Sequence, residues 1–92
     1  MFEFDKTKSD LNKQKHGIDF VEAQALWNDL NLREAPAPAD TGEERWIVIG
    51  MIERKHWTAV VAYREEKTRL ISVRRARKEE IKRYEENNSE RF

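Results

Sequence analysis

Three runs rich in apolar and β-branched residues follow one another in the second half of the chain, and they constrain the fold more than any other feature. They span residues 46–52, 57–63 and 69–74. The segments between them, 53–55 and 65–67, are short and charged. Strands joined by such short connections pair antiparallel, because a parallel partner needs a crossover of a dozen or more residues. The sequence therefore predicts an antiparallel meander.

Two more strands are expected ahead of this meander. Residues 30–35 would extend it by one strand. The loop at 36–42 would end that strand, because its two prolines, Pro36 and Pro38, cannot donate a backbone hydrogen bond to the sheet. Residues 2–4 alternate apolar and polar, which predicts a short first strand.

A first helix is predicted over residues 6–16. Asp5 can cap its start, and Gly17 can end it because glycine adopts the left-handed conformation at low cost. Leu11 is the one strongly apolar residue in this segment, so we expect a narrow packing face.

Two more helices are predicted from local signals. The second covers residues 18–28, where Asp19 and Glu22 have the spacing of a capping box. The third covers residues 76–87 and carries Tyr84 on its apolar side. Together with the strands, these helices predict an α+β domain.

Length and composition narrow the class of protein. Ninety-two residues, of which 39% are charged and 38% hydrophobic, suffice for one small domain, expected over residues 1–87 with a frayed tail at 88–92. The absence of cysteine excludes disulfides, thiol catalysis and cysteine-ligated zinc. No run approaches the roughly 20 apolar residues of a membrane span, and the start does not resemble a secretory signal. We therefore expect a soluble cytoplasmic protein.

Cofactor and metal signatures are also missing from the sequence. The three glycines are isolated, so no phosphate-binding loop is expected. The two histidines, His16 and His56, lack the spacing of a metal site. His16 ends the first predicted helix, and His56 is expected to be exposed to solvent at a hairpin edge.

The zero net charge conceals a strong asymmetry. Residues 1–53 carry six Lys and Arg against eleven Asp and Glu, whereas residues 54–92 carry twelve against seven. Such asymmetry suggests a polyanionic partner, and this is the interpretation we adopt; the alternative is a solvated helix face. The stretch from 67 to 78 contains no acidic residue and six basic ones, namely Lys67, Arg69, Arg74, Arg75, Arg77 and Lys78.

Strand alternation suggests where two of the arginines point. Arg74 should share a face with Leu70, opposite a face that carries Val73 and Arg75, and Arg64 of the preceding strand could join Arg74. Two guanidinium groups on one face would suit phosphate oxygens. Cross-strand pairing with the carboxylates of Glu53, Glu65 or Glu66 is an equally good interpretation of the pattern.

The order of the motifs resembles that of the BrnT family of type II toxins, within the RelE-like group of small ribonucleases. The resemblance runs over residues 2–86. Its most specific part is Lys15-His16-Gly17-Ile18, followed by Arg69-Leu70-Ile71-Ser72-Val73-Arg74-Arg75-Ala76 and then Tyr84-Glu85. Arg77 stands where the family often has Thr, which removes an expected helix cap.

The resemblance implies a RelE-like α+β fold, with two N-terminal helices, a small antiparallel sheet and one C-terminal helix. It also implies an endoribonuclease toxin that inhibits translation. A DNA-binding antitoxin of the ribbon-helix-helix type, similar to BrnA, would neutralise the toxin and bring it to operator DNA. A non-enzymatic binding module, or an inactive toxin that acts as a corepressor, remains the alternative.

The chemistry expected of such a toxin needs no metal ion or other cofactor. A ribose 2′-hydroxyl would attack the adjacent phosphate, and cations would stabilise the transition state. Arg74 is the first candidate for that role, followed by Arg64 and Arg75. Lys15 or His16 would assist proton transfer or RNA docking, and Tyr84 is a weaker candidate. The residues expected to bind RNA are Lys67, Arg69, Arg77 and Lys78.

Overall fold

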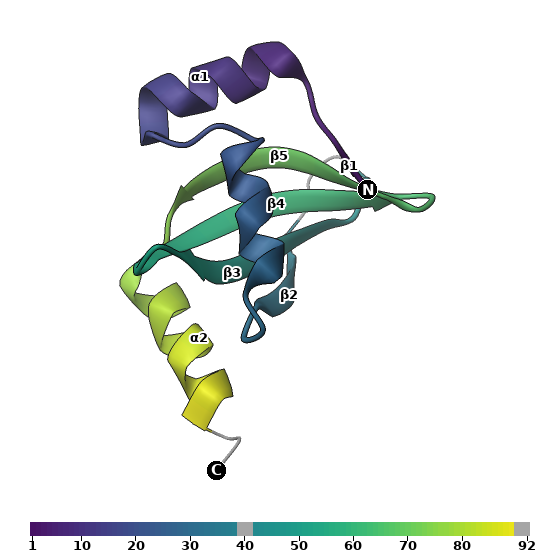
Figure 1. Cartoon of the computed structure of the whole chain (residues 1–92). Helices are drawn as coiled ribbons and strands as arrows, with labels where there is room; N and C mark the ends of the chain where they lie inside the picture. Colours follow the sequence, from purple (N-terminus) through teal and green to yellow (C-terminus); the bar gives the residue numbers. More distant parts are fainter. Residues whose placement is uncertain (39–41, 90–92) are drawn as a thin grey trace.

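The computed structural model describes residues 1–38 and 42–89 and confirms the α+β class (Figure 1). A five-stranded sheet has the order β1-β5-β4-β3-β2. The elements are β1 (Phe2–Glu3), α1 (Lys6–His16), the 3₁₀-helix η1 (Glu22–Asn28), β2 (Arg33–Ala37), β3 (Arg45–Ile52), β4 (Lys55–Arg64), β5 (Lys67–Arg75) and α2 (Lys78–Ser89).

Strands β2 to β5 form the predicted antiparallel meander. The sheet as a whole is mixed, however, because β1 pairs parallel with β5, placing Phe2 opposite Thr68. The prediction of an antiparallel sheet is therefore wrong for this strand. α1 and the rest of the chain intervene between β1 and its partner, and local sequence carries no signal for a pairing so distant.

Strand β2 lies three residues later than predicted at its start and includes Pro36 and Ala37, which were expected to lie in a loop. Pro36 is tolerated because β2 is an edge strand, where the ladder requires fewer donors. Residues 39–41 of the expected loop lie outside the described residues.

α1 has the predicted bounds and caps, but it packs differently from expectation. Asp5 accepts a hydrogen bond from the Lys8 amide, and Gly17 ends the helix with a φ of 82°. Leu11 is 56% exposed, and the face toward the sheet instead buries Ser9 and Asn12. The helix is held there by polar side chains that satisfy backbone groups.

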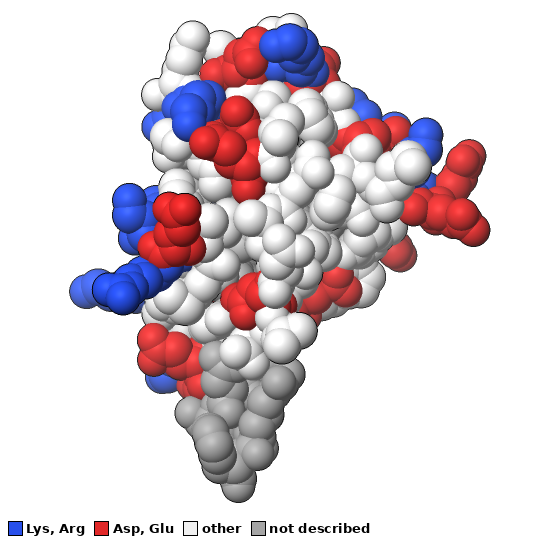
Figure 2. All heavy atoms as spheres, in the orientation of Figure 1, with Lys and Arg blue, Asp and Glu red and all other residues white. Residues whose placement is uncertain are grey.

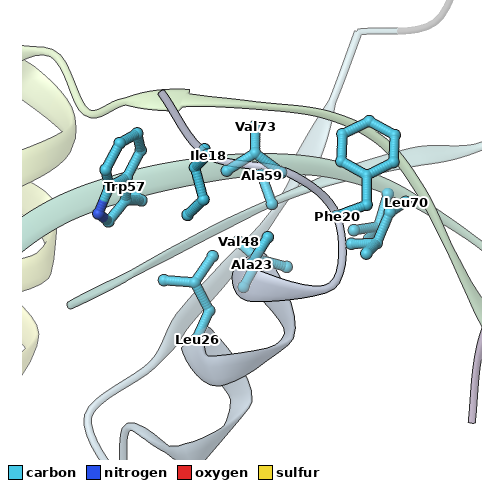
Figure 3. Packing of buried hydrophobic residues seen from close by; sticks show 10 residues of the cluster. Ile18, Phe20, Ala23, Leu26, Val48, Trp57, Ala59, Leu70 and Val73 are labelled. Carbon is cyan, nitrogen blue, oxygen red and sulfur yellow. The ribbon is translucent and has the colours of Figure 1, made fainter. Parts of the chain in front are cut away.

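The second predicted helix is shorter than expected and is a 3₁₀-helix. The capping-box bonds nevertheless form, because the Glu22 amide donates to Asp19 over 2.7 Å and the Asp19 amide donates to Glu22 over 3.0 Å. η1 crosses the sheet (Figure 1), and the core forms beneath it (Figure 3). The buried cluster consists of Ile18, Phe20, Ala23, Leu26, Val48, Trp57, Ala59, Val61, Leu70 and Val73.

A register shift between Val60 and Val61 of β4 changes the faces of β5. Val60 lies opposite Ser72 and Val61 opposite Leu70, so Ile71 is an extra residue. Leu70 and Val73 are consequently buried in the same core cluster. The prediction that Leu70 shares the face of Arg74 is wrong, because simple alternation stops at this bulge.

α2 leaves the end of β5 and contacts β3 and β2. It begins at Lys78, two residues after the predicted start, and continues to Ser89. Residues 88 and 89 of the expected frayed tail thus belong to the helix, and residues 90–92 lie outside the described part of the chain.

Candidate functional site

The basic residues predicted to act together lie at two opposite ends of the sheet. Arg64 is paired with Lys67 at the β4–β5 turn, whereas Arg74 lies opposite Thr58, near the start of β4. Six residues of strand separate the two positions, which is roughly 20 Å. The prediction that Arg64 joins Arg74 is therefore wrong.

The cations at the β4–β5 turn already have acidic partners. Arg64 forms an ion pair with Glu43 over 2.7 Å, and Arg69 lies 3.8 Å from Glu3. The alternative of pairing with carboxylates is thus correct for Arg64, although Glu43 replaces the expected partners. Lys67 lies at this end too, so two of the predicted RNA-binding residues are far from Arg74.

The opposite end of the sheet gathers the remaining cations. It comprises the β3–β4 turn, the end of β5 and the segment that enters α2, and we call it the basic end. Figure 2 shows blue side chains at the left of the molecule, where Figure 1 places these elements, with acidic side chains beside them. The cations of the basic end are Arg54, Lys55, Arg74, Arg75, Arg77 and Lys78.

The C-terminal end of α1 reaches the same part of the molecule. Gly17 and Ile18, which follow α1, line a cavity of about 350 Å³ together with Lys55 and Trp57. Lys15 and His16, in the last turn of α1, therefore lie near the basic end.

Arg74 lies on the sheet face opposite the core cluster, but α2 covers it there. Its Nη1 and Nη2 atoms donate to the two carboxylate oxygens of Glu80 over 2.7 and 2.9 Å. The Arg74 side chain is 24% exposed. This bidentate pair fills the guanidinium fork, so Arg74 does not present the open phosphate-binding group expected from the sequence.

Glu80 is held by more than Arg74. Its Oε1 atom also accepts from the Thr58 hydroxyl over 3.0 Å and from the Arg77 amide over 2.8 Å. Burial alone would raise the pKa of Glu80, but the hydrogen bonds from Arg74, the Arg77 amide and Thr58 outweigh it and lower the pKa to about 2. The bond to the Arg77 amide satisfies one donor at the start of α2, where Arg77 itself cannot cap the helix.

Arg75 is placed differently from its neighbour. It is exposed, and its guanidinium carbon lies 5.5 Å from the ring centroid of Trp57. Its Nε atom donates to the His56 carbonyl over 3.3 Å. Among the residues that the structure describes, no carboxylate forms an ion pair with Arg75. Its terminal nitrogens therefore remain open to bind an anion.

Tyr84 is 4% exposed and links α2 to the segment between η1 and β2. Its hydroxyl donates to Asp29 over 2.7 Å, and Asp29 also accepts from the amides of Asn31 and Met51. Burial by itself would raise the pKa of Asp29, but these three hydrogen bonds lower it below the ordinary value. Burial and this bond both disfavour a direct role of Tyr84 in proton transfer.

His56 was not a candidate on sequence grounds, yet it lies within this arrangement. Its ring packs edge-on against that of Tyr84, with 5.2 Å between the centroids, and it is half-buried instead of freely exposed. A signal was available, because His56 precedes Thr58 by two residues and so lies on the same sheet face as Thr58 and its cross-strand partner Arg74. Asp29 had no comparable signal, since it reaches this region only through the fold.

The described residues, 1–38 and 42–89, contain no group of three or more His, Asp or Glu side chains that could hold a metal ion. None of their helices is both long and apolar enough to span a membrane.

None of the curated proteins compared matches the chain. A family model described as "Ribonuclease toxin, BrnT, of type II toxin-antitoxin system" matches residues 4–80. The match contains α1, η1, the strands β2 to β5 and the first turn of α2.

Proposed function

The chain belongs to the BrnT family of ribonuclease toxins of type II toxin–antitoxin systems, and we propose that it cleaves RNA at the basic end of the sheet without a metal ion. Family membership itself implies an RNA target and an antitoxin partner. The observation that supports the location is Arg75, an exposed guanidinium that no carboxylate neutralises among the described residues.

The proposed reaction is an internal displacement at phosphorus. The ribose 2′-hydroxyl attacks the adjacent phosphate, the bond to the 5′-oxygen breaks, and negative charge gathers on the phosphate oxygens. Arg75 stabilises that charge, because its planar donors suit two phosphate oxygens and cost no reorganisation at the moment of reaction. Removing a single stabilising donor of this kind typically costs about 10²–10³-fold in rate.

The other cations of the basic end are proposed to hold the RNA backbone. Lys55, Arg77 and Lys78 are exposed and flank Arg75. Lys15 and His16 would extend this surface from the end of α1. Because such contacts release counterions, binding should weaken as salt increases.

Arg74 has a different proposed role from the one that its sequence position suggested. It holds the β5–α2 junction through Glu80, and thereby keeps Arg75 and Arg77 at the basic end. We leave Arg64, Lys67 and Arg69 out of the proposed site, because they lie at the other end of the sheet.

The cellular role is proposed from the resemblance of the sequence to the family. RNA cleavage in the cytoplasm would inhibit translation. A ribbon-helix-helix antitoxin would neutralise the protein, and the complex would bind operator DNA through the antitoxin.

The test is to map RNA ends after incubation with the purified protein, with and without EDTA. RNA should be supplied both free and in a translating extract. Attack by the 2′-hydroxyl predicts 2′,3′-cyclic phosphate and 5′-hydroxyl ends that form equally well in EDTA. RNA binding without cleavage under either condition would contradict the proposal and favour a binding module or an inactive corepressor. Cleavage that EDTA abolishes would contradict metal independence.

A further inference from the structure

The cavity of about 350 Å³ at the basic end lies between the end of α1, the helix η1 and the β3–β4 hairpin. Four of its lining residues are apolar, namely Ile18, Ala25, Ile52 and Trp57. Its volume is at the lower end of the range typical of small-molecule sites, which is about 300–1,000 Å³. The cavity therefore suits a single small ring system, whose faces would contact these apolar side chains.

The cavity lies on the same sheet face as Arg75. Trp57 is the cross-strand partner of Arg75, so their side chains share a face, and Lys55 shares it because it precedes Trp57 by two positions. Trp57 lies at one edge of the core cluster (Figure 3). Its ring centroid is 5.5 Å from the Arg75 guanidinium carbon, and its side chain also lines the cavity. A nucleotide whose phosphate binds Arg75 would therefore have its base within reach of the cavity.

Two carboxylates line the cavity, and only one of them is open. Glu22 accepts from the Lys13 ammonium over 2.8 Å and from the Asp19 amide over 3.0 Å. Glu53, in the β3–β4 turn, is exposed, and within residues 1–38 and 42–89 its side chain forms no hydrogen bond or ion pair. Both carboxylate oxygens of Glu53 are therefore free to accept hydrogen bonds from a ligand.

A free carboxylate distinguishes the four RNA bases by the donors on their Watson–Crick edges. Guanine presents two adjacent donors, N1–H and N2–H, which the two oxygens of one carboxylate can accept together. Adenine and cytosine present one amino group beside an acceptor nitrogen, and uracil presents one N–H between two carbonyls. Each of these three bases would set an acceptor against the carboxylate, so guanine is the base that matches Glu53.

We propose that the cavity binds a guanine base adjoining the scissile phosphate and that Glu53 recognises its Watson–Crick edge. This inference rests on the proposed ribonuclease function. The base lies against the apolar wall, Glu53 accepts from N1–H and N2–H, and Arg75 holds the phosphate. Glu53 touches no reacting atom. Its loss should therefore slow cleavage at guanine sites and leave cleavage at other sites unchanged.

The first measurement maps single-turnover cleavage by the full chain along one long RNA. The wild type should cut sites with guanine at one fixed adjoining position about 10–100-fold faster than other sites. Glu53→Gln replaces an acceptor oxygen with an amino donor and should abolish this preference. The matched control is Glu65→Gln at the β4–β5 turn, because Glu65 is also exposed and has a similar φ, 56° against 48° for Glu53. This control should keep the preference.

Inosine tests the same contact from the side of the RNA, because it lacks the N2 amino group of guanosine. At a mapped site, inosine in place of guanosine should slow the wild type about 10-fold and leave Glu53→Gln unaffected. An equal effect of inosine on both proteins would contradict recognition by Glu53.

Binding of free nucleotides tests the cavity without cleavage. In an NMR titration, guanosine 3′-monophosphate should shift the amide signals of Gly17, Ala25 and Glu53, and adenosine 3′-monophosphate should bind about 10-fold more weakly. Glu53→Gln should bind the two nucleotides alike. Equal binding of both nucleotides to the wild type, or no binding of either, would overturn the guanine site.

Failure of this inference is distinguishable from failure of the proposed function. A wild type that cleaves RNA without regard to the adjoining base, or a Glu53→Gln protein that keeps the preference, refutes the guanine site and leaves the ribonuclease proposal intact. A wild type that cleaves no RNA refutes the ribonuclease proposal, and the nucleotide titration then decides alone whether the cavity binds guanine.

Discussion

Arg74 of β5 and Glu80 of α2 form a bidentate ion pair that closes the junction between the sheet and the last helix, with N–O distances of 2.7 and 2.9 Å. The same carboxylate binds Thr58 of β4 and the amide of Arg77. One acidic side chain therefore joins β4, β5 and the start of α2. The arginine that the sequence favours for phosphate binding is used to build this junction, and its neighbour Arg75 is left open.

Removing Glu80 should destabilise the protein strongly. Glu80→Ala leaves Arg74 largely buried and without its counterion, which typically costs about 3–5 kcal/mol. The matched control is Glu79→Ala, an exposed neighbour in the same turn, which should change the free energy of unfolding by less than about 0.5 kcal/mol. Urea denaturation measures both. Equal effects of the two substitutions would contradict the structural role of Glu80.

The same residue should make stability depend on pH. The pKa of Glu80 is lowered from its ordinary value of 4.5 to about 2 in the folded state, so folding favours the charged form. This contribution is fully present above about pH 4.5, and it is lost as the pH falls toward 2. Its size is on the order of 3 kcal/mol. The difference in unfolding free energy between the wild type and Glu80→Gln should therefore shrink across this range. A difference that stays constant with pH would show that Glu80 does not titrate with a lowered pKa.

Asn12 should contribute more to the stability of the fold than Leu11, although an apolar side chain is usually expected to contribute more than a polar one. Asn12 is 7% exposed, and its amide bridges the Ile18 carbonyl and both backbone groups of Val73. Asn12→Ala leaves these buried groups without partners, at a cost of about 1–3 kcal/mol for each unsatisfied group. Leu11→Ala should cost less than about 0.5 kcal/mol, because Leu11 is mostly exposed. Thermal or urea unfolding compares the two variants, and a larger loss in Leu11→Ala would refute this packing.

Much of the fold could be predicted from local signals. Short charged turns predicted the meander, and Asp5 and Gly17 predicted the bounds of α1. The parallel pairing of β1 with β5 was not predictable in this way, because it depends on contacts between residues far apart in the sequence. Leu11 also misled the assignment of the buried face of α1, since the helix is anchored by hydrogen bonds and not by apolar area.

The candidate site was predictable only in part. The sequence correctly placed Arg74 on the sheet face opposite the core, but it could not show that α2 brings Glu80 into contact with Arg74 on that face. The grouping of Arg64 with Arg74 failed because both lie in the basic half of the chain but at opposite ends of a strand pair. The sequence predicted an exposed hairpin position for His56. Its ring contact with Tyr84, which Asp29 holds through a hydrogen bond, arises only from the three-dimensional fold.

The most direct measurement of the central claim compares RNA cleavage by Arg75→Ala and Arg64→Ala. Both substitutions remove one guanidinium, and they change opposite ends of the sheet. We predict that Arg75→Ala remains folded and loses about 10²–10³-fold in single-turnover rate, whereas Arg64→Ala stays within about threefold of the wild type. A folded Arg75→Ala that cleaves at the wild-type rate, or an equal loss in both variants, would contradict an active site at the basic end.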